Sequence, residues 1–157
     1  AEIIAKGRLL RGLVFFDQAR KMGRFVPMCE VITEKDEDKA TIPMTKNVAE
    51  SYKYVIDDLE AAIPGLPTEA LPGEPTKYAA EVLLSRALLQ AYAYTKNTEY
   101  LDKAITYAKD VTENCSLSNT YGGMFNEKDE TNPEILWGYY RLKANSTIGG
   151  YEELIRT

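Results

Sequence analysis

Histidine is absent from the 157-residue sequence, and cysteine and tryptophan are scarce, with two residues and one residue respectively. Without histidine the chain has neither a Ser-His-Asp nor a Cys-His nucleophile system, and it has no histidine-rich metal site. Two cysteines cannot form a four-cysteine zinc site. Composition alone therefore excludes several large classes of hydrolase and metalloprotein.

Positive charge and long apolar runs are also in short supply. The 19 Lys and Arg residues are outnumbered by 24 Asp and Glu residues, for a net charge of −5. A nucleic-acid-binding surface needs clustered basic residues, so this balance argues against one. No apolar run reaches the ~18 residues of a membrane span. With 45% hydrophobic and 27% charged residues, the composition is otherwise typical of one folded globular domain.

Two features of the sequence could indicate a metal site or a disulfide bond: a cluster of acidic residues and a pair of cysteines. Acidic residues cluster at 34–38 within the polar stretch 33–46, but they lack the Gly and terminal Glu of a helix-loop-helix calcium site. A solvated loop is expected there, and neither a metal nor another cofactor is predicted. Cys29 and Cys115 are expected to be free, buried thiols, with a disulfide left open as the alternative.

Hydrophobic periodicity predicts that the first part of the chain is helical. Apolar spacing, capping residues and proline positions predict helices at about residues 1–22, 47–63, 76–94 and 99–113. Asn47 and Glu50 form a capping box before the second helix, and Thr76 is the expected N-cap of the third. The third helix is apolar almost all round, so we expect it to be buried between neighbours.

The first helix has a broad apolar surface. Its main stripe is Ile3, Leu10, Leu13 and Phe16, widened by Leu9, Val14 and Phe15. Gly7 and Gly12 interrupt the same helix, and each weakens it by about 1 kcal/mol relative to Ala. Two glycines in one helix therefore indicate that a neighbouring helix packs closely against it.

Residues 116–157 differ in character from the helical part. The stretch 116–133 is rich in Asn, Ser, Thr and Gly, and residues 135–142 (ILWGYYRL) are predicted to form a strand. We therefore divide the chain into a helical scaffold, 1–115, and a loop and strand region, 116–157, of the same domain. The chain starts in helix without an initiator Met or a leader, so we expect it to begin inside a longer protein or to have been processed.

Five short motifs follow one another along the chain and are distributed over residues 2–140. They are GRLLRGLVFFD at 7–17, MGRFVPM at 22–28, VIDDLEAAIPGLP at 55–67, TKYAAEVLLSR at 76–86 and NPEILW at 132–137. Their sequence and order resemble those of the SusD/RagB family, which are outer-membrane nutrient-binding lipoproteins of Bacteroidetes. The departures are mild: Arg24 and Phe25 alter the second motif, and Tyr78 replaces a Gly in the fourth. The fourth predicted helix also resembles the second helix of a tetratricopeptide repeat.

The resemblance implies both a fold and a function. The fold would be mainly α, built from antiparallel helix pairs of tetratricopeptide type, with a loop-rich C-terminal part and one strand. SusD-like proteins are not enzymes. They bind glycans, or peptides in the RagB-like branches, and deliver them to a SusC-like TonB-dependent transporter. The resemblance also implies a position at the outer membrane, through a lipid anchor outside this chain.

Aromatic side chains are the candidate ligand contacts. Sugar rings have apolar C–H faces that stack on the flat side chains of Trp and Tyr. Trp137, Tyr139 and Tyr140 cluster in the predicted strand, and Tyr121 lies in the loop before it. The alternative for Trp137 and Tyr139 is packing in the core, because they share one face of a strand. The tyrosines on the predicted helices are expected to be packing or rim residues.

Two other functions remain open at this point. A glycosidase would need two carboxylates about 5–9 Å apart across a cleft. In this sequence, Glu130 and Glu134 come nearest to that requirement. A helical-repeat scaffold would instead bind a protein partner. Hydrolysis of a glycan, retention by a glycan, and retention only by a transporter would distinguish the three functions.

Overall fold

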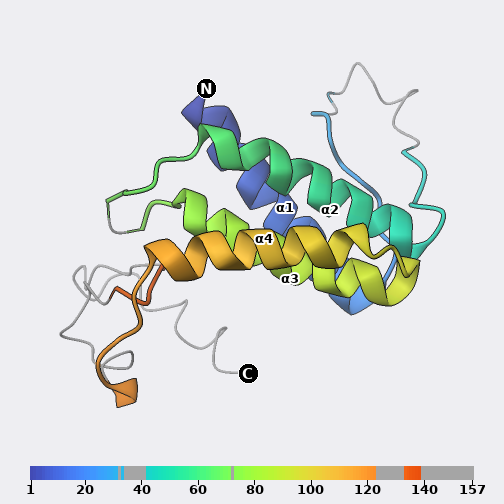
Figure 1. Ribbon diagram of the computed structural model, residues 1–157. Helices are drawn as coiled ribbons and strands as arrows, with labels where there is room; N and C mark the ends of the chain where they lie inside the picture. Colours follow the sequence, from blue (N-terminus) through green and yellow to red (C-terminus); the bar gives the residue numbers. More distant parts are fainter. Residues whose placement is uncertain (32, 34–41, 72, 123–132, 139–157) are drawn as a thin grey trace.

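The computed structural model describes residues 1–31, 33, 42–71, 73–122 and 133–138. It contains the α-helices α1 (Glu2–Met22), α2 (Val48–Ala62), α3 (Lys77–Thr95) and α4 (Glu99–Asn114), and the short 3₁₀ helix η2 (Ile63–Gly65) follows α2. Consecutive helices run in opposite directions (Figure 1). All four predicted helices are confirmed, and each end lies within one residue of the expected position.

The helices pack in chain order and not around a common axis. Helix α1 packs on α2, α2 on α3, and α3 on α4. Among these helices, α1 and α4 do not touch. The pairs α1–α2 and α3–α4 therefore form an open array of the tetratricopeptide type, because a closed four-helix bundle would bring the first and last helices together. The predicted fold class is confirmed.

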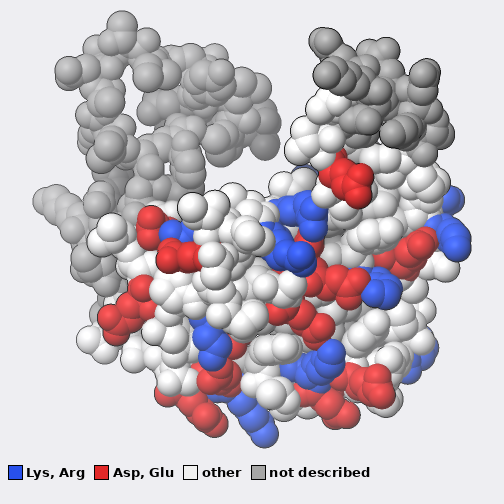
Figure 2. Space-filling view, turned by 90° about the horizontal axis from the view of Figure 1, so that it is seen from above, with Lys and Arg blue, Asp and Glu red and all other residues white. Residues whose placement is uncertain are grey.

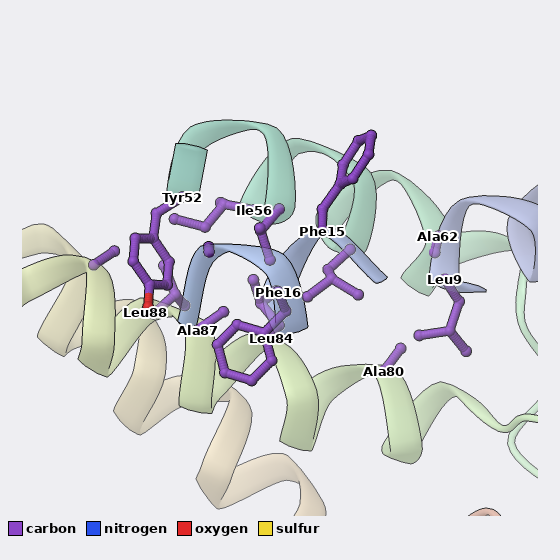
Figure 3. Close-up of a cluster of buried hydrophobic side chains, with 14 of the residues drawn as sticks. Leu9, Phe15, Phe16, Tyr52, Ile56, Ala62, Ala80, Leu84, Ala87 and Leu88 are labelled. Carbon is purple, nitrogen blue, oxygen red and sulfur yellow. The ribbon is translucent and has the colours of Figure 1, made fainter. Parts of the chain in front are cut away.

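The hydrophobic core lies where α1, α2 and α3 meet (Figure 3). Its most deeply buried large side chains come from all three helices: Leu9, Phe16, Tyr52, Leu59, Leu84 and Leu88. Small residues on α3, among them Ala80 and Ala87, are also buried and let the neighbouring helices approach closely. Helix α3 thus lies between α2 and α4, as its apolar sequence predicts.

The capping residues predicted for α2 and α3 bind the first turns of these helices through hydrogen bonds. The Asn47 side chain accepts a hydrogen bond from the Glu50 N–H at 2.8 Å. The Glu50 carboxylate in turn accepts from the N–H of Lys46, one residue earlier than a standard capping box has it. Thr76 Oγ1 accepts from the Ala79 N–H at 3.3 Å at the start of α3. Both predicted N-caps are confirmed.

Helix α1 buries only part of its predicted apolar surface: Leu9, Phe15 and Phe16 face the core. Its buried residues are Ala5, Leu9, Gly12, Phe15, Phe16 and Ala19. Ile3, Leu10 and Val14, which belong to the predicted apolar surface, are exposed. In the first four turns, apolar residues occur on most sides of the helix, so their spacing does not show which side is buried. Packing against α2 determines the buried side.

The two glycines of α1 have opposite surroundings. A Cβ added at Gly12 would lie 2.8 Å from Leu59 Cδ2, so α2 packs closely there as predicted. A Cβ added at Gly7 would meet nothing within 4 Å, so the same prediction is wrong for Gly7 within the described residues. Gly12 therefore marks the crossing of α1 and α2, and Gly7 lies on the outer side of α1.

The strand predicted at 135–142 is not formed over residues 135–138. The backbone bends there, and the Leu136 carbonyl accepts a hydrogen bond from Thr76 Oγ1 at 3.3 Å. A strand needs a neighbouring strand for its backbone hydrogen bonds, and the described residues contain no strand. Residues 139–142 lie outside the described part of the chain. The boundary proposed at residue 115 also stays a prediction, because most of 116–157 lies outside it.

Both cysteines are free thiols, but they are not both buried. Cys29 is exposed, because it lies on the extended segment that follows Pro27, and Cys115 is partly buried at the end of α4. The prediction of free thiols is confirmed, and the prediction that both are buried is wrong for Cys29. The acidic cluster at 34–38 lies outside the described residues.

Candidate functional site

The described ligand candidates lie at the end of the helix array where α3 begins and α4 ends (Figure 1). The chain enters α3 through a turn in which the Glu74 N–H donates to the Leu71 carbonyl at 2.9 Å. Gly73 adopts φ +88° in this turn, a conformation that side chains rarely tolerate. The turn presents the Gly73 carbonyl to Trp137, whose indole N–H donates to it at 3.1 Å.

Trp137 is partly buried and packs against the hydrophobic core. Tyr121 is 83% exposed, on the segment that follows α4. The Ser118 N–H donates to Glu134 Oε2 at 3.0 Å, which ties the segment carrying Tyr121 to the segment carrying Trp137. Tyr139 and Tyr140, the other two candidates, lie outside the described residues.

Thr76 joins the candidate site to the helical scaffold. Its hydroxyl oxygen accepts from the first turn of α3 and its O–H donates to the Leu136 carbonyl. One side chain therefore caps the helix and holds the segment of Trp137 beside it. The sequence pattern indicates the first role, whereas the second depends on a residue 60 positions away.

A charged cluster lies directly behind this end of the array. Lys77 Nζ is 2.6 Å from Asp110 Oδ2 and 3.3 Å from Glu81 Oε1, so it joins α3 to α4. The hydrogen bond to Lys77 lowers the pKa of Asp110. Burial raises the pKa of Glu81, and Glu81 Oε2 has no hydrogen-bond partner among the described residues. Burial also raises the pKa of the Cys115 thiol, which disfavours the nucleophilic thiolate.

The described residues hold no group of three or more side chains suited to a metal ion. In Figure 2, acidic and basic side chains are interspersed over the face that is shown, without a large area of one sign. Such a surface does not provide the basic footprint that a nucleic-acid backbone requires.

A separate hollow of about 330 Å³ lies at the start of α2, away from Trp137. Its lining comes from two extended segments and α2: Pro27, Cys29, Glu30, Ile42, Pro43, Met44, Thr45, Lys46, Glu50 and Tyr54. The lining as a whole is not a sequence motif, because it combines three separate parts of the chain. Periodicity and spacing therefore provide no signal for this hollow.

Comparison with solved structures identifies the fold. A crystal structure of a SusD-like protein from Bacteroides fragilis superposes with a TM-score of 0.73 over 89% of this chain, at 23% sequence identity. A second crystal structure has a TM-score of 0.72 over 87% of this chain, at 27% identity.

Sequence comparison points to the same family. A curated SusD-like protein of Bacteroides ovatus is 27% identical to this chain over 139 residues, which is 85% of the chain. No family model matches the sequence. In sequence and in fold, the chain is similar to SusD-like proteins. The resemblance found in the five motifs is thus confirmed by an independent alignment and by the fold.

The chain spans about a quarter of the length of that relative, 25%, and 27% and 28% of the two solved chains. Within its described residues, no helix is both long enough and apolar enough to cross a membrane.

Several carboxylates that the structure describes are engaged in contacts of the scaffold. Asp58 accepts hydrogen bonds from Arg11 Nε and Nη2, both at 2.6 Å, and Arg11 Nη1 donates to the Cys29 carbonyl at 3.0 Å. These bonds join α1, α2 and the extended segment after α1, and the bond to Asp58 raises the pKa of Arg11. Glu134 is bound to Ser118, and Glu130 lies outside the described residues.

Proposed function

We propose that this chain is the helical scaffold of a non-catalytic SusD-like protein that binds glycans at the cell surface. The full protein would be held at the outer membrane by a lipid anchor outside this chain, and would pass its ligand to a SusC-like TonB-dependent transporter. The observation that carries the proposal is the similarity to a SusD-like protein over 85% of the chain. The same open array of helix pairs in a SusD-like crystal structure supports it.

The placement of the carboxylates favours binding over catalysis. Hydrolysis of a glycosidic bond needs an acid and a second carboxylate on opposite sides of a cleft. Asp58 is buried against Arg11, and Glu81 and Asp110 share Lys77. Asp58 and Asp110 therefore join neighbouring helices, and Glu81 is buried within the array, so these three carboxylates are not arranged as a pair across a cleft.

The ligand contacts that we propose are Trp137 and Tyr121, together with Tyr139 and Tyr140 from outside the described residues. Trp137 is held by Gly73 and by the core, so its ring has a fixed position. A ring that is already fixed loses little entropy when a sugar stacks on it. The exposure of Tyr121 leaves it accessible to a ligand that reaches this end of the array.

Affinity electrophoresis against a panel of soluble polysaccharides tests the binding function. The full-length protein and this 157-residue chain are run side by side. We expect the full-length protein to be retarded by at least one glycan and the chain alone to migrate freely, as a scaffold would. Retention by peptides alone would replace glycan binding with RagB-like peptide uptake. Release of sugars from the gel would contradict a non-catalytic role.

The role of Trp137 is tested in the full-length protein by Trp137→Ala. If its ring stacks on the ligand, the substitution removes an aromatic contact, and we expect the dissociation constant for the retained glycan to rise about three- to tenfold. Tyr94→Ala is the matched control, because Tyr94 is an exposed aromatic residue at the opposite end of α3. Equal retention of the two variants would remove Trp137 from the site.

A further inference from the structure

The segment that carries Trp137 is attached to two helix ends that lie side by side. The Leu136 carbonyl accepts a hydrogen bond from Thr76, the N-cap of α3, at 3.3 Å. The carboxylate of Glu134 accepts from the backbone N–H of Ser118, on the chain that leaves α4, at 3.0 Å. The distance between the start of α3 and the end of α4 therefore affects where this segment lies.

A single lysine joins the same two helix ends. Lys77 follows Thr76 directly, and its Nζ is 2.6 Å from Asp110 Oδ2 on α4. The other oxygen of Asp110 accepts from the side chain of Asn114, the last residue of α4, at 3.0 Å. The pair of Lys77 and Asp110 is therefore placed to set the spacing between the two attachment points of the segment.

Glu81 competes for this lysine from a buried position. Its side chain is 2% exposed, and its Oε1 is 3.3 Å from Lys77 Nζ. Its Oε2 has no hydrogen-bond partner among the described residues. A buried carboxylate that is incompletely paired is costly, whereas the protonated group loses less on burial. When Glu81 and Asp110 are both ionised, one ammonium group has to neutralise two carboxylates.

The surroundings of Glu81 favour its protonated form. Burial raises the pKa of Glu81 most, the Asp110 carboxylate acts in the same direction, and Lys77 opposes both; within the described part of the chain these are the two charged groups that act on it. Tyr107 of α4 and the Cys115 thiol also interact with Glu81, and burial raises the pKa of each. The bond to Lys77 lowers the pKa of Asp110. As the pH rises, Asp110 therefore ionises first and Glu81 later.

We propose that Glu81, Lys77 and Asp110 form a proton-sensitive latch that holds Trp137 in position while Glu81 is protonated. In the closed latch, Lys77 pairs with Asp110 and the three groups together are neutral, so the end of α4 stays against the start of α3. Ionisation of Glu81 leaves one uncompensated negative charge at a buried site, and water has to enter to solvate it. The two helix ends then move apart, and the segment that carries Trp137 loses its fixed position.

The consequence for ligand binding rests on the function proposed above. If Trp137 stacks on a glycan, the closed latch binds the glycan more tightly, and a bound glycan in turn favours protonated Glu81. We expect the dissociation constant to rise about two- to fivefold as Glu81 ionises. This loss is smaller than that caused by Trp137→Ala, because the ring is still present. The movement of Trp137 itself requires no ligand.

The movement of Trp137 is measured without ligand in the full-length protein. Its tryptophans are replaced by fluorotryptophan, and the fluorine NMR signal of Trp137 is the one missing from Trp137→Phe. We expect the chemical shift of this signal to follow a single titration with its midpoint above pH 4.5, the ordinary pKa of Glu81. Glu81→Gln should abolish the titration, because glutamine has the shape of the protonated acid and cannot ionise.

Glu134→Gln is the matched control, because Glu134 is a carboxylate of the segment that carries Trp137. Glutamine at this position can still accept from the Ser118 N–H, so the attachment is kept while the titrating group is removed. The titration of the Trp137 signal should persist in this variant. Its loss in Glu134→Gln, its persistence in Glu81→Gln, or its absence from the unaltered protein would each overturn the latch.

Glycan affinity at the same pH values separates the latch from the proposed function. A dissociation constant that rises with pH in the unaltered protein, but not in Glu81→Gln, would support both. A titrating Trp137 signal with an affinity independent of pH would support the latch and contradict the role of Trp137 in binding. An affinity that changes with pH while the Trp137 signal stays constant would overturn the latch.

Discussion

Two adjacent aspartates in α2 have opposite environments. Asp58 has a side chain that is 6% exposed and is held by Arg11 of α1. Asp57 is 57% exposed and pairs with Lys53 one turn away. Successive residues of a helix point about 100° apart, so one carboxylate meets the neighbouring helix and the other meets water. The same residue type therefore has two different energetic roles at neighbouring positions.

We expect Asp58→Ala to lower the free energy of unfolding by about 1–3 kcal/mol, because it leaves the partly buried donors of Arg11 without their acceptor. Asp57→Ala is the matched control and should change stability by less than about 0.5 kcal/mol, since exposed ion pairs contribute little. Urea denaturation of the two variants measures the difference. Similar losses would mean that the Arg11–Asp58 pair is not special.

The two glycines of α1 provide a second pair of opposite expectations in this chain. Gly7→Ala should raise the free energy of unfolding by about 0.5–1 kcal/mol, because alanine stabilises a helix and the added methyl group meets nothing. Gly12→Ala should lower it by about 1–3 kcal/mol, since the added methyl group would lie 2.8 Å from Leu59 Cδ2 and Leu59 is fully buried. Thermal unfolding measures both, and shifts of the same sign would contradict this placement of α1.

At the scale of the element, α3 carries a carboxyl group into a buried position. Glu81 is 2% exposed and contacts Lys77. Burial raises the pKa of Glu81, and the neighbouring Asp110 carboxylate acts in the same direction, while Lys77 opposes the shift. An acid whose pKa is raised by folding favours the folded state while it is protonated. The α3–α4 contact should therefore weaken as Glu81 ionises.

This argument predicts a pH dependence that Glu81→Gln removes. The stabilising effect of protonated Glu81 is complete below its ordinary pKa of 4.5 and is lost as the pH rises through the raised pKa of the folded state. The stability of Glu81→Gln relative to the unaltered chain should therefore increase as the pH rises above 4.5. Urea denaturation at a series of pH values measures this difference. A difference that does not change with pH would show that Glu81 titrates normally.

At the scale of the whole molecule, the helices of the open array differ in the number of neighbouring helices that cover them. Helices α2 and α3 each have neighbours on two sides, whereas α1 and α4 are at the ends. Stability in such arrays comes from contacts between neighbours in sequence. The same openness leaves the start of α3 and the end of α4 accessible for the segment that carries Trp137.

We expect amide hydrogen exchange in this chain to be slowest in α2 and α3 and faster in α4, because α4 is held from one side by α3. Local opening can then expose α4 without unfolding the core of α1, α2 and α3. Mass spectrometry of peptides from each helix measures the rates. Identical protection of all four helices would indicate a single cooperative unit.

The sequence by itself determined the helices, their capping residues and the family resemblance. The cap of Asn47 acts over a few residues, and the bounds of the helices follow from apolar spacing, which needs only helical periodicity. For the candidate site, the sequence pointed to aromatic residues of which Trp137 and Tyr121 are described. It did not find the partners that hold them, because Gly73 and Glu134 are distant along the chain.

Only the tertiary structure decided which side of α1 is buried, how Asp58 is paired, and that residues 135–138 bend against α3. Each of these depends on groups that are far apart in sequence and meet only after the helices pack. The sequence pattern of a helix that is apolar on most sides is compatible with several packing arrangements. The close contact of Gly12 with Leu59 selects one of them, because a Cβ at that position would force this contact to shift.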